Sequence, residues 1–205
     1  MAKIFSRTGR AVLANVVDPI ARFMLRRGVT PNMVTVAGTV GVVLSAILLG
    51  ARGHLIAGAL ITTVFALTDL LDGTMARMGH GSTFGALLDS SMDRIADAAV
   101  FGAVIYYLYG QDNPYNGLVA GLICLAAGQV VSYVKARAQS LGLNADVGIA
   151  ERLERLIIVG VGGLISGAGL EWGLPAALWL LAALSVITVF QRLIHAARTA
   201  KASAA

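Results

Sequence analysis

The chain has 205 residues, enough for one domain, and 57% of them are hydrophobic while only 13% are charged. A water-soluble domain carries about 25% charged residues, so this composition excludes that class. The formal net charge of +5 is modest, and it gives no indication of a nucleic-acid partner. Cys124 is the single cysteine and lies in an apolar run, so the chain forms no internal disulfide. We expect one all-α membrane domain over residues 1–205.

The first 28 residues mix basic and apolar side chains. Segment 3–27 predicts a short amphipathic helix at the membrane interface, broken near Pro19. A solvated basic face explains the individual basic residues equally well. No cleavable signal peptide is visible, because the first strong apolar run lacks a nearby cleavage-like site. Thr30 followed by Pro31 predicts a helix start, with the threonine as N-cap and the proline at the first helical position.

Six apolar segments follow, and each is a candidate for a membrane-spanning helix, which needs about 20 residues. They are Met33–Gly50, Leu55–Met75, Phe84–Tyr109, Asn116–Lys135, Leu153–Ala168 and Leu174–Leu193. Glycine, proline, asparagine or charged residues interrupt the chain between them. We expect six transmembrane helices after an N-terminal juxtamembrane amphipathic helix (residues 1–28), and a disordered tail over residues 199–205.

The placement of lysine and arginine predicts the orientation of these helices in the membrane. If the N-terminus is cytoplasmic, six helices return the C-terminus to the same side. The basic residues of both termini and of the breaks near 77 and 135–155 then lie in the cytoplasm, and essentially Arg52 remains opposite. We therefore expect a multi-pass protein of the plasma membrane with both termini and its site facing the cytoplasm.

Two adjacent apolar segments each carry a pair of aspartates at helical spacing. Asp69 and Asp72 are three residues apart, and Asp89 and Asp93 are four apart, so each pair shares one face of its helix. The short break at 79–81 makes the two helices antiparallel neighbours. The four carboxylates are therefore expected at similar depth, near the cytoplasmic end.

Carboxylates in an apolar helix need a neutralising partner, since each costs roughly 2.5–3.5 kcal/mol at the centre of a membrane helix. Asp97 extends the same face one turn deeper. Hard oxygen ligands suit Mg²⁺, Mn²⁺ or Ca²⁺, and the absence of histidine and cysteine disfavours zinc. The alternative is a set of structural ion pairs with Arg77 and Arg94, but four acids exceed what such pairing needs.

Small residues and one arginine adjoin the aspartates. Gly73 lets a ligand approach the backbone, and Ala76 keeps the same face small. Arg77 offers a group that suits a phosphate. Together with the acids, these residues predict a metal–diphosphate site, in which the metal stabilises charge that develops on a leaving phosphate.

The stretches DLLDGTMAR (from Asp69) and GALLDSSMD (from Gly85) resemble the signature of the CDP-alcohol phosphotransferase family, D-x2-D-G-x2-A-R followed by G-x3-D-x3-D. One departure is that seven residues separate Arg77 from Gly85, where eight are more usual, and this concerns the loop contact at Ser82 or Thr83. Within the family, the stretches TPNMVT, QVVSYVKARA, IAERLERLIIV and VITVFQR are similar to the phosphatidylinositol phosphate synthases of actinobacteria.

The resemblance implies a six-helix homodimer that transfers a phosphatidyl group from CDP-diacylglycerol to inositol 1-phosphate and releases CMP. It implies that Asp69, Asp72, Asp89 and Asp93 hold two divalent ions, Mg²⁺ with Mn²⁺ as an alternative, and that Asp93 is also the general base. The contacts that it implies for CDP-diacylglycerol are Thr30, Pro31, Asn32, Met33, Asp69, Gly73, Ala76, Arg77 and Ser82.

Polar and basic residues of the later helices form a candidate site for the acceptor phosphate. They are Ser132, Lys135, Arg137, Arg152, Arg155 and Arg192. Positive-inside topology or lipid head-group contact explains any single one of them equally well. Glycerol 3-phosphate, the acceptor of phosphatidylglycerophosphate synthases, is the nearest rival acceptor because it also carries a phosphate. A cation transporter with an acidic intramembrane site is the alternative of another class, although the acidic motif is not repeated in the second half of the chain.

Overall fold

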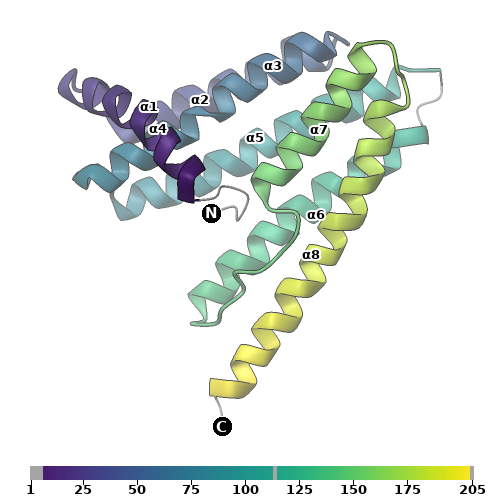
Figure 1. Cartoon of the computed structure of the whole chain (residues 1–205). Helices are drawn as coiled ribbons and strands as arrows, with labels where there is room; N and C mark the ends of the chain where they lie inside the picture. Colours follow the sequence, from purple (N-terminus) through teal and green to yellow (C-terminus); the bar gives the residue numbers. More distant parts are fainter. Residues whose placement is uncertain (1–6, 113–114, 204–205) are drawn as a thin grey trace.

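The computed structural model describes residues 7–112 and 115–203, and every regular element in these ranges is helical (Figure 1). In chain order the elements, of which η1 and η2 are π-helical, are α1 (Arg7–Arg26), α2 (Pro31–Ser45), η1 (Ala46–Gly50), α3 (Leu55–Ala66), α4 (Thr68–Met75), η2 (Ala76–His80), α5 (Thr83–Tyr109), α6 (Tyr115–Ser140), α7 (Arg152–Gly167) and α8 (Gly173–Ser203). Because α2 runs into η1 and α3 runs through α4 into η2, each predicted apolar segment corresponds to one helical rod.

Four stretches of the described chain are long and apolar enough to cross a membrane by length and composition. They are Pro31–Gly50, Leu55–His80, Gly117–Ser140 and Gly173–Lys201. The two remaining rods, α5 and α7, do not meet this criterion, each for its own reason. Helix α5 carries several charged residues among its 27, and α7 has only 16 residues. An all-helical membrane protein is therefore confirmed, whereas the count of six spans stays a prediction.

The rods run alternately up and down the bundle and pack around an apolar core. Helix α2 lies against α3, α4 and α5, while α6 lies between α5 and α8, and α7 bridges α3 and α8 (Figure 1). The core contains the fully buried side chains of Phe101, Cys124, Leu178 and Leu181. This arrangement brings the N-terminal parts of α4, α5 and α7 to the same region of the molecule.

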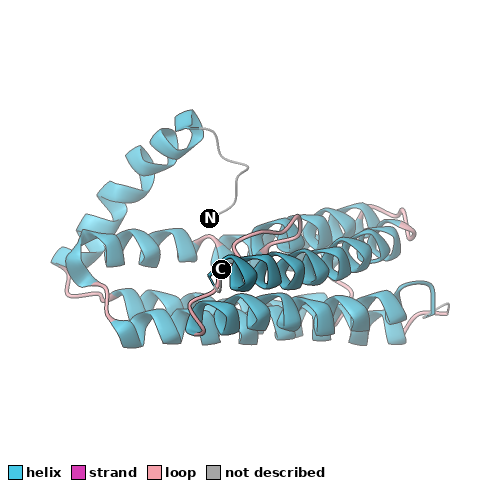
Figure 2. Ribbon diagram, turned by 90° about the horizontal axis from the view of Figure 1, so that it is seen from below, coloured by secondary structure: helices cyan, strands magenta, loops and turns pink. Residues whose placement is uncertain are grey.

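Helix α1 leaves the bundle at an angle, as Figure 2 shows for the helix next to the N-terminal trace. Its C-terminal half contacts the bundle through Ala21, which is fully buried with Val34 and Met75. Phe23 on another face is exposed, and the Arg27 guanidinium lies 4.8 Å from its ring centroid. An exposed apolar side chain beside basic groups is the composition that suits a membrane interface.

Two predicted features of the chain ends are wrong in detail. Helix α1 continues through Pro19 instead of breaking there, because a proline removes one hydrogen bond while the turns on either side keep theirs. Helix α8 continues to Ser203, so residues 199–203 of the predicted disordered tail are helical, while residues 204–205 lie outside the described residues. The residues from Thr199 to Ser203 are mostly alanine and lysine, which are strong helix formers, and none of them breaks the helix.

The predicted helix start at Thr30 is confirmed, and a matching one begins α5. The Thr30 hydroxyl accepts a hydrogen bond from the Met33 N–H at 3.3 Å, with Pro31 at the first helical position. The Ser82 hydroxyl accepts one from the Gly85 N–H at 2.9 Å. Gly79 reverses the chain before α5 with φ of +96°, a conformation that favours glycine. Capping therefore determines where both helices begin.

Close packing of α2 on α3 depends on Gly41. A Cβ atom at this position would lie 2.2 Å from Cδ1 of Phe65. We therefore expect Gly41→Ala to lower the free energy of unfolding by about 1–3 kcal/mol through overpacking. Thermal unfolding of the purified protein measures this loss. Gly102→Ala is the matched control, since a Cβ there meets nothing within 4 Å, and equal melting temperatures of the two variants would contradict the prediction.

Candidate functional site

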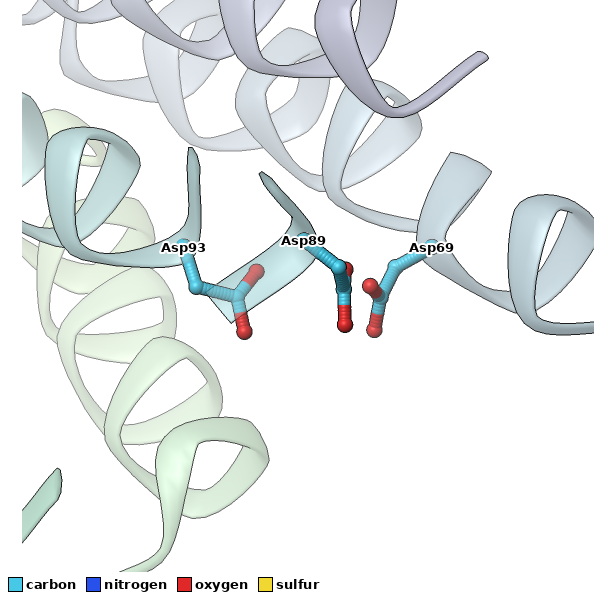
Figure 3. Close-up of side chains that lie close together, drawn as sticks. All are labelled: Asp69, Asp89 and Asp93. Atoms are coloured by element: carbon cyan, nitrogen blue, oxygen red, sulfur yellow. The ribbon is translucent and has the colours of Figure 1, made fainter. Parts of the chain in front are cut away.

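Three of the predicted aspartates converge where α4 and α5 meet. Asp69 lies in the first turn of α4, and Asp89 and Asp93 lie one turn apart on α5 (Figure 3). One carboxylate oxygen from each lies within 4.8 Å of the others. Asp89 Oδ1 is buried and has no hydrogen-bond partner among the residues that the structure describes. Converging hard oxygen donors with an unsatisfied atom fit a divalent cation.

Asp72 belongs to the same region but turns towards α2. It is 5% exposed, and one carboxylate oxygen accepts a hydrogen bond from the Thr35 hydroxyl at 2.6 Å. The same hydroxyl lies 3.1 Å from the Pro31 carbonyl. Thr35 is a functional candidate that the sequence reasoning missed. Its signal was a hydroxyl within an apolar run, one helical turn after Pro31.

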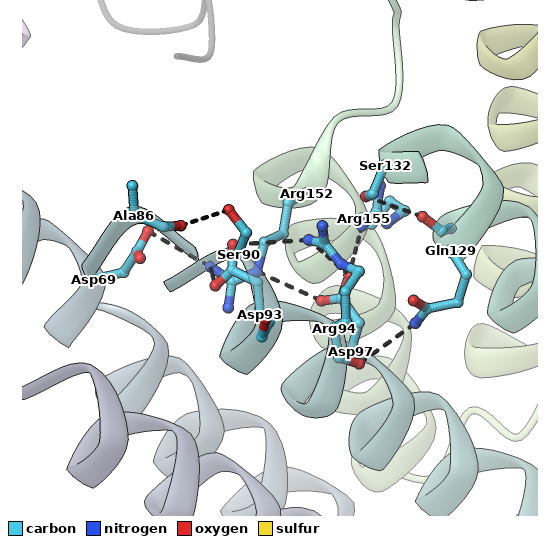
Figure 4. Close-up of polar contacts among 12 residues, drawn as sticks. Asp69, Ala86, Ser90, Asp93, Arg94, Asp97, Gln129, Ser132, Arg152 and Arg155 are labelled. Carbon is cyan, nitrogen blue, oxygen red and sulfur yellow. Dashed lines mark hydrogen bonds and ion pairs between the residues drawn. The ribbon is translucent and has the colours of Figure 1, made fainter. Parts of the chain in front are cut away.

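Arg152, at the start of α7, lies directly against the aspartates (Figure 4). Its Nη1 atom is 2.8 Å from Asp93 Oδ1 and 3.5 Å from Asp69 Oδ2. Arg94 contributes a longer contact, with its Nη2 atom 3.7 Å from Asp93 Oδ2. Arg77 instead donates to the Thr74 hydroxyl at 2.8 Å. The acids thus meet a cation from a helix 59 or more residues away in sequence, which spacing within one segment could not reveal.

An open cavity of about 740 Å³ extends from the aspartates between α3, α5, α6 and α7. Its polar end is lined by Asp69, Asp89, Asp93, Ser132, Lys135, Arg152, Arg155 and Arg192. Its remaining walls are apolar or small, and include Leu55, Gly58, Ala59, Val100, Ala103 and Gly163. One cavity therefore offers carboxylates for a cation, basic groups for a phosphate and an apolar surface for hydrocarbon.

A model of the CDP-alcohol phosphatidyltransferase family matches residues 28–191 of the chain. The chain belongs to this family. It is 46% identical over 192 residues to the phosphatidylinositol phosphate synthase of Mycobacteroides abscessus, covering 93% of this chain and 87% of that protein. It is also 46% identical over 196 residues to the protein of the same name from Corynebacterium glutamicum, covering 93% of this chain and 88% of that protein. The resemblance inferred from the aspartate pattern is thereby confirmed.

Solved structures of a family member share this fold. The phosphatidylinositol phosphate synthase of Mycobacterium tuberculosis with CDP-DAG bound matches at a TM-score of 0.83 and 46% identity, covering 89% of this chain and 94% of that one. The same enzyme in complex with manganese and citrate matches at 0.81 and 46% identity, covering 87% of each chain. This protein is therefore a phosphatidyltransferase-family enzyme with the helical arrangement of that synthase.

The residues predicted to contact CDP-diacylglycerol surround the α4–α5 hairpin. Asn32, at the start of α2, reaches the start of α5, since a Cβ on Gly85 would lie 2.9 Å from Asn32 Oδ1 and 3.1 Å from Ser82 Oγ. The Arg77 guanidinium lies over Gly73, where a Cβ would be 3.3 Å from its Nη1 atom. The structure thus gathers most of this set at one end of the bundle, with Ser82 serving locally as the helix cap.

The predicted acceptor residues divide into two groups. Ser132, Lys135, Arg152, Arg155 and Arg192 line the cavity. Arg137 is exposed outside it, and its Nη1 atom donates to the Ser140 hydroxyl at 3.3 Å. The structure therefore brings five of the six residues together.

Two of these cavity residues hold the loop between α6 and α7. Lys135 Nζ lies 2.5 Å from Asp146 Oδ1, and this hydrogen bond and charge lower the pKa of the Asp146 carboxyl. Arg192 donates to the Val131 carbonyl at 2.6 Å and to the Val147 carbonyl at 2.8 Å. The cationic end of the cavity is thus anchored to the backbone of α6 and to the loop.

We expect Asp89→Asn to weaken Mn²⁺ binding by at least about tenfold. Mutating a residue that merely hydrogen-bonds to a metal ligand already weakens metal binding by about tenfold or more, and loss of the ligand itself should cost at least as much. Isothermal titration of the purified protein with MnCl₂ measures this affinity. Glu171→Gln, an exposed acid at the α7–α8 turn, is the matched control. Equal Mn²⁺ affinities of Asp89→Asn and the unaltered protein would contradict the cation site.

Proposed function

We propose that this protein transfers the phosphatidyl group of CDP-diacylglycerol to inositol 1-phosphate, giving phosphatidylinositol phosphate and CMP. The observation that carries the proposal is the cavity whose polar end combines three aspartates with Lys135, Arg152, Arg155 and Arg192. A cationic wall beside a cation site suits an acceptor that itself bears a phosphate. The relatives at 46% identity carry the name of this activity.

The reaction is a displacement at the β-phosphorus, the atom that bears diacylglycerol. The acceptor hydroxyl oxygen forms a bond to this phosphorus as the bond to the oxygen shared with the cytidine phosphate breaks. The electron pair leaves with CMP, and the hydroxyl proton passes to Asp93. The Asp93 side chain is 21% exposed and lines the cavity, so an acceptor hydroxyl can come within hydrogen-bond reach of it.

Asp69, Asp89 and Asp93 would hold the divalent ions together with Asp72, through the Asp72 oxygen that is not bonded to Thr35. We propose two Mg²⁺, with Mn²⁺ as a substitute. When bound, these ions would neutralise charge on the diphosphate oxygens. Thr30–Met33, Gly73, Ala76, Arg77 and Ser82 would contact the CDP group from the outer side of the α4–α5 hairpin. The apolar walls of the cavity would receive hydrocarbon of the lipid.

The proposal places the enzyme in the plasma membrane with six spans, both termini in the cytoplasm, and a homodimer as the working unit. The family resemblance supports the homodimer, and the distribution of charge supports the orientation. The site lies at the end of the bundle where α2, α5 and α7 begin, and Arg52 lies in the turn at the other end (Figure 1). Basic residues favour the cytoplasmic side, so the lipid substrate would be reached from the inner leaflet.

The acceptor assay tests the substrate directly. We expect labelled CDP-diacylglycerol to release CMP with inositol 1-phosphate and not with glycerol 3-phosphate, and we expect a chelator to stop the release. Chromatography of the lipid product and of CMP measures both. Turnover with glycerol 3-phosphate and not with inositol 1-phosphate would show that the proposed acceptor is wrong. Unchanged turnover in the presence of chelator would refute the metal dependence.

Asp93→Asn should abolish phosphatidyl transfer while CDP-diacylglycerol still binds, because the amide keeps the shape but cannot take the proton. Single-turnover release of CMP measures the chemical step, and equilibrium binding of the labelled lipid measures the retained affinity. Asp112→Asn, an exposed acid beyond the far end of α5, is the control. Normal turnover by Asp93→Asn would exclude this residue as the base.

A further inference from the structure

Asp97 is a buried aspartate for which the proposed chemistry has no role. It follows Asp93 by one helical turn on α5 and is only 2% exposed. Its Oδ2 atom accepts a hydrogen bond from Arg155 Nη2 at 2.6 Å, and the two side chains are 3% and 1% exposed. Since 58 residues separate the partners in sequence, this ion pair ties the middle of α5 to the first turn of α7.

The same carboxylate faces two further guanidinium groups (Figure 4). Asp97 Oδ1 lies 3.5 Å from Arg152 Nε, and Oδ2 lies 3.9 Å from Arg94 Nη2. Arg152 therefore contacts Asp97 through Nε, while its Nη1 atom reaches Asp93 at 2.8 Å. Because a guanidinium group is planar and rigid, an ion-pair contact at Nε restricts the directions in which the Nη atoms point.

Stability alone does not account for this arrangement. A buried ion pair is often no more stabilising than apolar residues of similar volume, although removing one partner is strongly destabilising. Arg152 and Arg155 both line the polar end of the cavity, and like charges so close together need a counter-charge. Asp97 supplies that charge from behind the wall. The Arg152 side chain stays 21% exposed at the cavity, and the buried Arg155 lies directly behind it.

We propose that Asp97 is a positioning residue that holds Arg152 and Arg155 at the cavity wall, so that they present positive charge to the phosphate of the acceptor. The inference rests on the proposed function, because it takes the acceptor phosphate as the ligand of these arginines. Asp97 acts through the arginines and touches neither substrate. Loss of its charge should therefore affect the acceptor and spare the lipid donor.

Asp97→Asn removes the charge and keeps the shape of the side chain. We expect the KM for the acceptor to rise on the order of tenfold or more, because a displaced phosphate-binding group loses its geometry. The KM for CDP-diacylglycerol should stay unchanged. Steady-state kinetics with each substrate varied in turn measures both constants, and Glu171→Gln serves as the control. Equal increases of both KM values, or a fall in kcat with an unchanged acceptor KM, would overturn the proposal.

A double-mutant cycle separates positioning from a merely structural role. Asp97→Asn leaves Arg155 buried without its partner, whereas Asp97→Asn combined with Arg155→Gln removes both charges, so we expect the melting temperature to fall in the first and recover in the second. The acceptor KM of the double variant should be no lower than that of Arg155→Gln alone, because Arg152 also loses its contact with Asp97. An acceptor KM that recovers together with stability would overturn the proposal. If Asp97→Asn does not fold, an acceptor KM of the double variant below that of Arg155→Gln would overturn it.

The kinetics use whichever of inositol 1-phosphate and glycerol 3-phosphate the unaltered protein converts. Failure of inositol 1-phosphate as acceptor would therefore refute the proposed substrate and leave the test of Asp97 intact. If neither acceptor is converted, the proposed function fails, and the melting temperatures still test the coupling. Additive losses of stability for Asp97→Asn and Arg155→Gln would then overturn the role of Asp97.

Discussion

Arg152 joins aspartates of α4 and α5 to the start of α7, and the rest of the site depends on this contact. Its guanidinium meets Asp69, Asp93 and Asp97 at 2.8–3.5 Å. Carboxylates carried on apolar helices are costly without positive charge nearby, so the α4–α5 hairpin requires a cationic partner. Helix α7, which packs against α3 and α8, supplies that partner from its N-terminal turn.

The same constraint connects packing with chemistry. The loop that precedes α7 is held to α8, because the Ala150 and Ile149 N–H groups donate to the Thr188 hydroxyl at 3.1 and 3.3 Å. Arg192, one turn further along α8, binds two backbone carbonyls of α6 and the loop. Satisfied backbone groups thus fix the first turn of α7, and with it the arginines that face the cavity. Because these arginines are held rigidly, their geometry for binding the acceptor is set before the acceptor arrives.

Much of the fold and the centre of the site could be predicted from sequence because they depend on local spacing. The helical rods begin within two residues of the predicted segments. Thr30 and Ser82 cap two of them, α2 and α5, through their own hydroxyls. Asp89 and Asp93 share a face by their spacing of four. Asp72 shows the limit of this reasoning, because Thr35, 37 residues away, draws its carboxylate towards α2. The predicted break at Pro19 and the predicted disordered tail were wrong, because the continuity of a helix depends on its neighbouring turns as well as on single residues.

The sequence by itself determined the membrane class, the helical rods, the family and the aspartates of the site, since hydropathy and helical periodicity are properties of short segments. Only the tertiary structure decided which charges neutralise one another. Arg152 and Arg155 share a helix with Glu154 and lie near Glu151 in sequence, yet they pair with Asp93 and Asp97 of α5. The physical reason is burial: the packing of α7 on α3 and α8 buries its arginines within ion-pair distance of α5. The nearest counter-charge in space then outweighs the nearest one in sequence.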